Sequence, residues 1–427
     1  MPRVLDHVKN MLKSKDFQSR HKESPRDFTR KSKLPFETMI SFFLNLNKGS
    51  YNTELKELHK AKSGDIVGIN HAHKSAISKA RKKLKPSAFV ELNDELISYS
   101  EAMLPLEKWH GFRLLGIDGS TSNIPNEKEI VDHFGAWHPP HAKEPCPKAR
   151  VSQMYDVLNQ LSVDAIIAPK SKGERELAEQ HLLKSMAGDL LLLDRGYESI
   201  FLFFLILSVG ADFCSRIKIS GSNQAKTFMR SGKDEQIIAI NLPPKWHERA
   251  QEAGIEVNPV KLRYVRVDLP TGETELLITS LLDKEKYPHH LFKGLYHQRW
   301  AIEEDYKVLK KRAQIECFSG KTVRSVYQDF HAKVLSKNIT ATLINSLKPV
   351  VFRTAPIYKV NFTQALAAMK NSIVAIIESQ YEKAAKITNQ LLKAFFMCLE
   401  AVRPGRSFPR NPRNLRGKFY FEYKAPA

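Results

Sequence analysis

The stretch DLLLLD, residues 189–194, places four consecutive leucines between two aspartates. A run that is apolar at every position, instead of at alternate positions, is typical of a strand whose two faces are both covered. Such strands form the centre of open α/β sheets, where ligands bind beyond the carboxyl ends of the strands. The stretch therefore predicts a buried central strand that ends in Asp194 at the functional edge of a sheet.

The segments around this strand continue the α/β pattern. Residues 111–118, GFRLLGID, are typical of a short apolar strand that ends in Asp118, and residues 151–169 predict two strands joined by a tight turn. The elements that follow are an amphipathic helix, the leucine strand, a buried helix and another strand, at residues 172–186, 189–194, 200–209 and 211–219. The order strand-strand-strand-helix-strand-helix-strand predicts a mixed sheet flanked by helices.

The bulk composition restricts the kind of partner. The chain of 427 residues carries 67 Lys and Arg against 46 Asp and Glu, a net charge of +21. Such an excess favours a polyanionic partner, most often nucleic acid, although a ribosomal or membrane-surface role fits the charge alone. Four widely spaced cysteines without a CxxC pair argue against a disulfide framework or a structural zinc site, and they suit a reducing cytosol. The longest apolar run, residues 200–209, is too short to span a bilayer.

Three other regions differ from the α/β pattern. Residues 220–285 contain strand-like segments around a turn and predict a β-rich insertion. Residues 1–105 are helical and basic by pattern, and two short helices within residues 53–85 favour either a helix-turn-helix or a charged surface helix in a bundle. Residues 322–402 are helical by pattern, and a basic tail with interleaved aromatic residues follows.

These regions together predict an α/β multidomain protein. The expected parts are a helical DNA-binding domain at residues 1–105, a catalytic core at residues 106–219 and 286–321, a β-rich insertion at residues 220–285, and a helical C-terminal region with a basic tail at residues 322–427.

One charged segment, LYHQRWAIEEDYKVLKKR at residues 295–312, predicts a helix with an unusual face. On a regular helix Tyr296, Arg299, Glu303 and Lys310 fall within roughly 60° of one another, and Lys307 lies close to them. A carboxylate among bases and beside an apolar stripe is suited to hold a metal ion or to pair with a neighbouring arginine. For this segment alone, a salt-bridged surface helix is the stronger interpretation.

The other two acids of the segment are expected to lie elsewhere on the helix. Glu304 falls further than Glu303 from the apolar stripe, and Asp305 is expected to point the opposite way. Only Glu303 is therefore a candidate for chemistry.

Two aspartates elsewhere in the chain favour a metal site over a salt-bridged surface helix. Asp118 and Asp194 each end a predicted buried strand, and Glu303 adds a third carboxylate from a later helix. Mg²⁺ prefers oxygen ligands, and two such ions about 4 Å apart can activate a water or a 3′-hydroxyl and stabilise the leaving oxygen. The three carboxylates predict in-line phosphoryl transfer on a nucleic-acid backbone, whose phosphates also account for the basic surroundings.

At these residues the chain resembles the insertion-sequence 4 family of bacterial DDE transposases. The spacing Y-x2-R-x3-E-x6-K of Tyr296, Arg299, Glu303 and Lys310 matches that family's signature, and the strand-helix order resembles a ribonuclease-H-like fold. The motifs GIDGS and LLDRGY resemble the two aspartate motifs of the family. The β-rich insertion and the N-terminal KLPFETMISFFLNLNKGS also match, so that the resemblance covers about residues 28–315.

The resemblance implies a role for each matching residue. Asp118, Asp194 and Glu303 would hold Mg²⁺, with Mn²⁺ as a substitute and two ions expected, and Tyr296, Arg299 and Lys310 would grip DNA phosphates. Three further DNA contacts are candidates: Lys307, Trp300, which could stack on an unpaired base or pack as a rim residue, and Arg216, which could reach the site from a neighbouring strand.

The resemblance also implies a function. We expect a cut-and-paste DNA transposase of the bacterial cytoplasm, associated with the nucleoid and not with a membrane. It would act as a homodimer in a synaptic complex on the terminal inverted repeats of its own element and on target DNA, with a hairpin step. Two alternatives remain at this point: a nuclease of the same fold without strand transfer, and a non-catalytic DNA-binding protein derived from a transposase.

Overall fold

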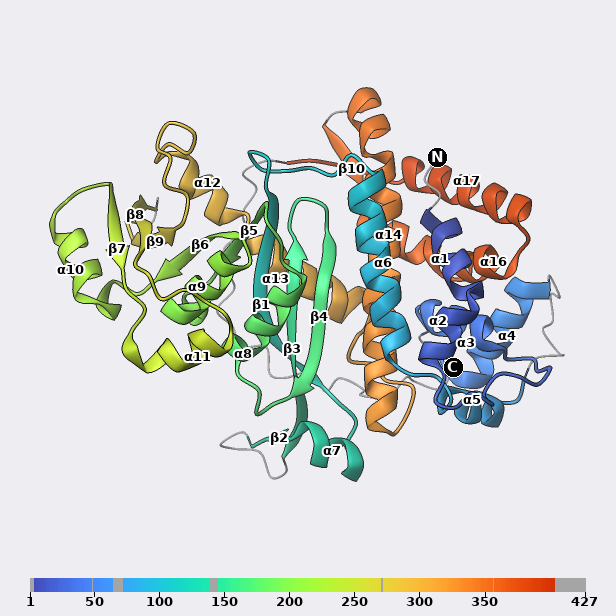
Figure 1. Ribbon diagram of the computed structural model, residues 1–427. Coiled ribbons are helices and arrows are strands. Elements are labelled where there is room, and N and C mark those ends of the chain that lie inside the picture. Colours follow the sequence, from blue (N-terminus) through green and yellow to red (C-terminus); the bar gives the residue numbers. More distant parts are fainter. Residues whose placement is uncertain are drawn as a thin grey trace. The chain divides into compact units, whose positions relative to one another are not determined.

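A computed structural model describes residues 4–47, 49–63, 72–138, 145–269, 272–355 and 357–403. The chain folds into two compact units, whose elements are labelled in Figure 1. The helical unit comprises Met1–Leu106, Thr121–Ala149 and Lys307–Ala427, and the sheet unit comprises Glu107–Ser120 and Arg150–Tyr306. In the described part of the chain, no helix combines the length and the apolar character needed to cross a membrane.

Most strands of a nine-stranded mixed sheet belong to the sheet unit. Its order is β2-β3-β1-β5-β6-β9-β8-β7, and β4 pairs with β3. The strands are β1 (Arg113–Asn123), β2 (Ala136–Trp137), β3 (Cys146–Asp156), β4 (Leu161–Pro169), β5 (Asp189–Leu193), β6 (Asp212–Ile217), β7 (Glu235–Ile240), β8 (Val260–Asp268) and β9 (Thr274–Thr279). Strand β5 is parallel to both β1 and β6, whereas β6, β9, β8 and β7 pair antiparallel in turn.

The first strands of this sheet have the expected ribonuclease-H-like arrangement. In chain order they are β1, β3 and β4, then helix α8 (Glu174–His181), β5, helix α9 (Ile200–Ser208) and β6. All five residues of β5 are buried, as a strand that is covered on both faces requires. The mixed sheet flanked by helices confirms the predicted fold class.

The region that follows β6 extends the same sheet. Strand β9 pairs with β6, and β8 and β7 continue outward from it. Helices α10 (Asn223–Arg230) and α11 (His247–Glu252) lie in the same region of the sequence. The β-rich character of this insertion is therefore as predicted, and its strands are hydrogen-bonded to the core sheet instead of forming a separate one.

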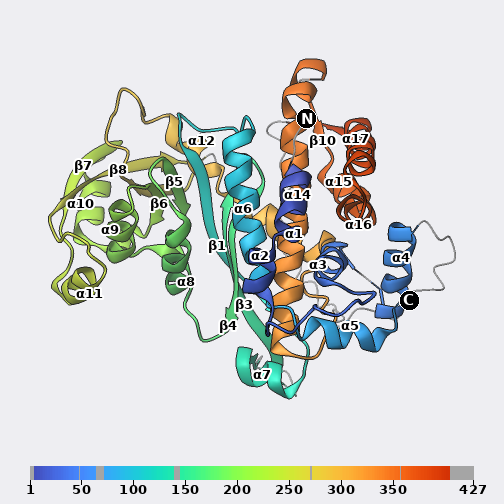
Figure 2. The same ribbon diagram turned by 45° about the vertical axis from the view of Figure 1, so that its right-hand side comes forward.

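The helical unit is built around the long helix α14 (Val323–Thr354), which begins with a capping box at Thr322. It contacts α1, α3, α6, α15 and α17, and Figures 1 and 2 both show α6 running beside it. The other helices of the unit are α1 (Val4–Lys13), α2 (Lys15–His21), α3 (Phe36–Leu44), α4 (Tyr51–Ser63), α5 (Lys74–Arg81), α6 (Ser87–Met103), α7 (Lys128–Phe134), α15 (Phe362–Met369), α16 (Ser372–Glu378) and α17 (Tyr381–Met397). Short strands β10 (Tyr358–Val360) and β11 (Leu399–Ala401) pair antiparallel.

Helix α5 is the basic helix that was predicted within residues 53–85, and it contributes a buried side chain to the helical unit. Its Arg81 is buried, donates to Gln328 and pairs with Asp329 of α14. Helices α4 and α5 occupy the expected positions, but residues 64–71 between them lie outside the described residues, as does the basic tail at residues 404–427. The helix-turn-helix hypothesis stays a prediction.

Candidate active site

The two candidate aspartates are neighbours across a parallel strand pair. The ladder between β1 and β5 ends with the pair Ile117 and Leu193, and Asp118 and Asp194 are the next residues on the two chains. Neighbouring strands lie about 4.8 Å apart, so the two carboxylates project from adjacent positions. The sheet thus brings together two residues that lie 76 positions apart in the sequence.

Asp118 does not end its strand, which corrects one expectation. Strand β1 continues to Asn123, because it stays paired with β3 on its other side after β5 has ended. Only the ladder with β5 stops at Ile117. Asp118 therefore lies within a continuing strand, at the position where the neighbouring strand β5 ends.

The segment that carries Glu303 is not one regular helix, which corrects a second expectation. Helix α12 (Leu291–His297) and helix α13 (Trp300–Lys307) are separated at residues 298–299 by i→i−3 hydrogen bonds, and a π-helical turn (Val308–Arg312) follows α13. Residues three apart eclipse in such a tight turn, whereas a π turn winds more slowly than an α-helix. Side-chain directions expected for a regular α-helix, at about 100° per residue, therefore no longer apply beyond the two irregular turns.

Three members of the signature nevertheless lie together. The guanidinium of Arg299 lies 5.8 Å from the ring centroid of Tyr296, and its Nη2 donates to Glu303 Oε1 at 3.0 Å. Tyr296 is buried, and its hydroxyl donates to the carbonyl of Leu193 at 3.4 Å, directly before Asp194. Burial raises the pKa of Tyr296, so this hydroxyl stays protonated. The eclipsed turn keeps Tyr296 and Arg299 on one side despite the break.

Helix α13 is packed onto β1. A side-chain carbon added at Gly116 would lie 3.6 Å from Ile302 Cβ, and the hydroxyl of Tyr306 donates to the carbonyl of Asp118 at 2.8 Å. These contacts hold the turn that carries Glu303 against the strand that carries Asp118. Glu304, by contrast, is exposed.

Asp305 was expected to point to the opposite side of the helix from Tyr296 and Glu303. It is buried and accepts a hydrogen bond from Gln153 Nε2 at 2.8 Å. Helix α13 is therefore covered on a second side as well as along its apolar stripe.

The electrostatics of Asp118 mark a crowded anionic site. Burial raises its pKa to about 6, and the charges of Glu303 and Asp194 add to that effect. A hydrogen bond from the backbone of Gly119 and the charge of Arg299 act in the opposite direction without cancelling it. A carboxyl group that resists ionisation beside two other carboxylates is typical of a site that binds a cation.

Asp194 is held by positive groups. It caps the 3₁₀ turn Arg195–Tyr197 by accepting from the backbone N–H of Arg195, and its Oδ1 lies 2.9 Å from Arg216 Nη2. Burial alone would raise the pKa of Asp194, but the Arg195 N–H and the charges of Arg299 and Arg216 outweigh it and lower that pKa. The predicted approach of Arg216 to the site is thus present in the structure. Arg216 also pairs with Glu275 at 2.6 Å.

The remaining predicted DNA contacts differ in position. Trp300 is 40% exposed, and the guanidinium of Arg299 lies 5.6 Å from its ring centroid. Lys307 and Lys310 belong to the helical unit, where Lys307 is exposed. Lys310 Nζ donates to the carbonyl of Thr121 at 2.7 Å, which ties the π turn to the end of β1. The roles of these residues stay predictions.

Sequence reasoning missed two side chains next to the aspartates. Glu174, at the start of α8, would lie 3.1 Å from a side-chain carbon at Gly119, and it accepts from Arg150 Nη1 at 2.7 Å. Tyr197 is buried near the charges of Asp118, Glu174 and Asp194, and its hydroxyl has no hydrogen-bond partner within the described residues. The only sequence signal was the pair of glycines that follow the two aspartates, since these leave room for the Glu174 side chain.

A buried grouping of serine, histidine and aspartate lies in the sheet unit. Ser152 Oγ lies 2.9 Å from His181 Nε2, and Asp164 Oδ2 lies 2.7 Å from His181 Nδ1. Burial would raise the pKa of Asp164, but the hydrogen bond from His181 and the charges of His181 and Lys184 lower it to about 2. Ser152 and His181 are each 0% exposed, so the arrangement is a buried structural network with no access for a substrate.

The three carboxylates fit a divalent cation in chemistry but not in their present pairing. Oxygen ligands from Asp118, Asp194 and Glu303 are those that Mg²⁺ prefers. Within the described ranges, no three His, Cys, Asp or Glu side chains are gathered closely enough to hold an ion as they stand. In the structure Asp194 pairs with Arg216, and Glu303 pairs with Arg299.

Comparison with known proteins shows the family of the chain. A family model described as Transposase DDE domain matches residues 109–339, more than half of the chain. The chain belongs to this family of DDE transposase domains. The family confirms the resemblance drawn from the signature and the two aspartate motifs.

Two particular relatives are similar to this chain. The transposase InsG for insertion sequence element IS4 of Escherichia coli (strain K12) is 26% identical over 242 residues, which are 56% of this chain and 53% of that protein. The match thus spans about half the length of this curated relative. A solved structure of a piggyBac transposase in a synaptic complex with hairpin DNA is similar to this chain with a TM-score of 0.48 and 9% identity. The similarity covers 96% of this chain and 88% of that chain.

Proposed function

We propose that this chain is a DNA transposase that moves an insertion sequence by metal-dependent strand cleavage at the terminal inverted repeats. One observation carries the proposal: Asp118 and Asp194 directly follow the last register pair of β1 and β5, and Glu303 of α13 is close enough to Asp118 for its charge to raise the pKa of Asp118. Membership in the family of DDE transposase domains and the similarity to a transposase of an insertion sequence support it.

The three carboxylates would hold Mg²⁺, or Mn²⁺ as a substitute, and two ions are expected. Such ions activate the attacking oxygen and stabilise the leaving oxygen of a phosphodiester. Asp118 would bind an ion as the carboxylate. Burial raises its pKa to about 6, so the loss of its proton would accompany ion binding at lower pH. Tyr306 fixes the backbone of Asp118 from α13 and so keeps the distance between the two elements constant.

The arginines would supply the coupling to DNA. In the structure Arg216 and Arg299 neutralise Asp194 and Glu303. A phosphate offers each guanidinium a new anion with bidentate geometry, so that the carboxylates become free for a cation at the same moment. Tyr296 orients Arg299 through its ring and its bond to Leu193.

Three further side chains would contact DNA. We propose that Lys307 and Lys310 act as point charges on phosphates and that Trp300 stacks on an unpaired base, which its exposure permits. We retain the division into an end-recognising domain at residues 1–105, a core at residues 106–219 and 286–321, an insertion at residues 220–285 and a C-terminal region at residues 322–427 as part of this proposal. The protein would act as a homodimer that joins two element ends in the bacterial nucleoid.

The reaction would proceed in four displacements. A water attacks a phosphorus at the element end, and the 3′ oxygen leaves as a hydroxyl. That hydroxyl attacks the opposite strand, which closes a hairpin and releases the flanking DNA. A second water opens the hairpin by hydrolysis and frees the 3′-hydroxyl again. This hydroxyl attacks a phosphorus of the target DNA, so that one phosphodiester forms while one breaks and the target's own 3′ oxygen leaves as a hydroxyl.

The test uses purified full-length protein, Mg²⁺ or Mn²⁺, and labelled DNA that carries an end of its element. We expect nicks, hairpins and joined products from the wild type. The variants Asp194→Ala and Glu303→Ala should lose all three products and keep binding to the end. A wild type that binds ends and never cuts them contradicts the proposal, and nicks without joined products reduce it to a nuclease.

A further inference from the structure

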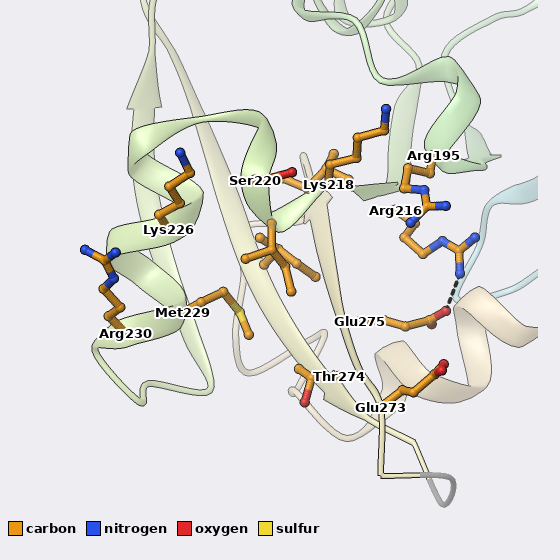
Figure 3. Close-up of a pocket in the computed structure, with 13 residues that line it drawn as sticks. Arg195, Arg216, Lys218, Ser220, Lys226, Met229, Arg230, Glu273, Thr274 and Glu275 are labelled. Atoms are coloured by element: carbon orange, nitrogen blue, oxygen red, sulfur yellow. Dashed lines mark hydrogen bonds and ion pairs between the residues drawn. The ribbon is translucent and has the colours of Figure 1, made fainter.

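A pocket of about 960 Å³ lies in the sheet unit next to Asp194, and no role has been assigned to it above (Figure 3). Its walls come from the end of β6, the following 3₁₀ turn, helix α10 and the start of β9. A volume of this size is at the upper end of the range for sites that bind small organic ligands, and it can admit a nucleotide.

The lining of the pocket is strongly basic. Five cationic side chains, Arg195, Arg216, Lys218, Lys226 and Arg230, face two glutamates across it. In Figure 3, Lys226 and Arg230 stand at the α10 end, Arg195 and Arg216 at the opposite end, and Lys218 between them. The charges therefore form a row across the pocket instead of a single cluster.

Most of these cations are not neutralised by the protein. Within the ranges that the structure describes, Arg195, Lys218, Lys226 and Arg230 make no ion pair, whereas Arg216 pairs with Glu275 and Asp194. All four are exposed. Unpaired cations along one wall are an electrostatic footprint for a polyanion, since phosphates would replace only solvent.

The floor of the pocket is apolar. It is formed by Ile217, Ile219, Met229 and Leu276, and Ile219 is 37% exposed. Duplex DNA presents phosphates and groove edges to a protein and keeps its base faces stacked inside. An unpaired strand, in contrast, can lay a base or a sugar on an apolar surface while its phosphates meet the cations.

The pocket is continuous with the candidate active site. Arg195 directly follows Asp194, and Arg216 contacts both Asp194 and the pocket residue Glu275. A strand that leaves the carboxylates along this side would pass from Arg216 to Lys218 and then to Lys226 and Arg230.

We infer that this basic pocket binds an unpaired DNA strand beside the cleavage site, with its phosphates on the row of cations and a base or sugar on the apolar floor. The identity of that strand as one displaced during cleavage rests on the proposed function. The binding itself does not require any chemistry to occur.

The test compares the full-length wild type with the triple variant Lys218→Gln/Lys226→Gln/Arg230→Gln. The probe is a labelled oligothymidylate of about 12 nucleotides, a length typical of single-strand binding grooves. Its affinity is measured by fluorescence anisotropy over a range of salt concentrations without divalent cations. The variant should bind at least about tenfold more weakly at low salt, and the slope of log K against log [salt] should be smaller by about 2, since each lost phosphate contact removes about 0.7.

A matched control carries the same kind of change outside the pocket. The variant Lys233→Gln/Lys261→Gln changes two exposed lysines of the insertion. The change in affinity and in slope that it causes should be at most about a third of the change that the triple variant causes. A duplex of the same length should lose less affinity than the single strand does. Unchanged single-strand binding by the triple variant overturns the inference, and so does an equal loss for duplex and single strand.

The outcome is separable from that of the proposed function. A wild type that cuts no end DNA defeats the proposed function, yet the triple variant's loss of single-strand affinity would still support the basic pocket. A wild type that cuts and joins DNA, together with a triple variant of normal single-strand affinity, defeats only the pocket.

Discussion

Asp118 and Asp194 directly follow Ile117 and Leu193, the last paired residues of two adjacent parallel strands. Their proximity is therefore a property of the sheet and does not depend on a loop. Glu303 is positioned differently, because α13 packs on Gly116 of β1 and Tyr306 donates a hydrogen bond to the carbonyl of Asp118. The site combines two fixed carboxylates with one that a helix positions.

The two adjacent glutamates should differ sharply in importance. Glu303→Gln removes a carboxylate that faces Asp118, and it should slow strand cleavage at least about a hundredfold, the usual cost of losing one group that stabilises developing charge. Glu304→Gln changes an exposed side chain and should leave the rate within about threefold of the wild type. Single-turnover cleavage of end DNA by each variant measures the difference. Equal losses would refute the assignment of Glu303.

Arg299 should contribute to DNA binding as well as to order in the site. Arg299→Ala removes a guanidinium that is 5% exposed and paired with Glu303, so binding to end DNA should weaken and the salt slope should fall by about 1. Arg249→Ala, which removes an arginine paired with Glu179, is the control and should retain the wild-type slope. Gel-shift titrations at several salt concentrations provide both numbers. A slope that is unchanged in Arg299→Ala would mean that Arg299 touches no phosphate.

The ionisation of Asp118 should be visible in the stability of the metal-free protein. Burial raises its pKa to about 6, whereas an unfolded chain has an aspartate pKa of about 3.9. The folded protein therefore binds this proton more tightly, and the free energy of unfolding loses a contribution as the pH rises from about 4 through about 6.

The matching variant isolates this effect. Relative to Asp118→Asn, the wild type should lose on the order of 3 kcal/mol of unfolding free energy between pH 4 and pH 7, the equivalent of the change in pKa. Urea denaturation in the presence of a chelator measures the difference at each pH. A difference that does not vary with pH would contradict the buried, crowded environment of Asp118.

The buried serine–histidine grouping should matter for stability and not for chemistry. Ser152→Ala removes one hydrogen bond to His181 and should lower the free energy of unfolding by about 1–3 kcal/mol, because the imidazole nitrogen is left without its partner. Cleavage of end DNA at a temperature well below the unfolding transition should be unchanged. Loss of cleavage in a folded Ser152→Ala variant would argue for a nucleophilic role that the burial of Ser152 speaks against.

The central strand and its aspartate could be predicted because they depend on local pattern. Four leucines in succession need cover on both faces, and that requirement alone specifies the environment of β5 and the edge at which Asp194 emerges. The same reasoning placed Asp118 at a strand end, whereas β1 continues to Asn123 through its pairing with β3. That continuation depends on a partner strand, which a local pattern does not contain.

The break between α12 and α13 could not be predicted from the sequence either. Residues 295–312 contain neither Pro nor Gly, so nothing local indicated a tight turn at residues 298–299 or a π turn after Lys307. Tyr296, Arg299 and Glu303 were still grouped correctly, because spacings of three and four residues survive one eclipsed turn. Glu174 was indicated only indirectly, by the glycines that follow the two aspartates, since its position depends on the space beside Gly119.

The most direct test of the central claim is Mn²⁺ binding to the full-length protein on end DNA, measured by the loss of the free-ion electron paramagnetic resonance signal. The claim is that Asp118, Asp194 and Glu303 together hold the ions. The wild-type complex should bind Mn²⁺ tightly, and Asp118→Asn, Asp194→Asn and Glu303→Gln should each bind it at least about tenfold more weakly while they still bind DNA. If any one of the three variants retains the wild-type affinity for Mn²⁺, that residue is not part of the metal site and the account is wrong.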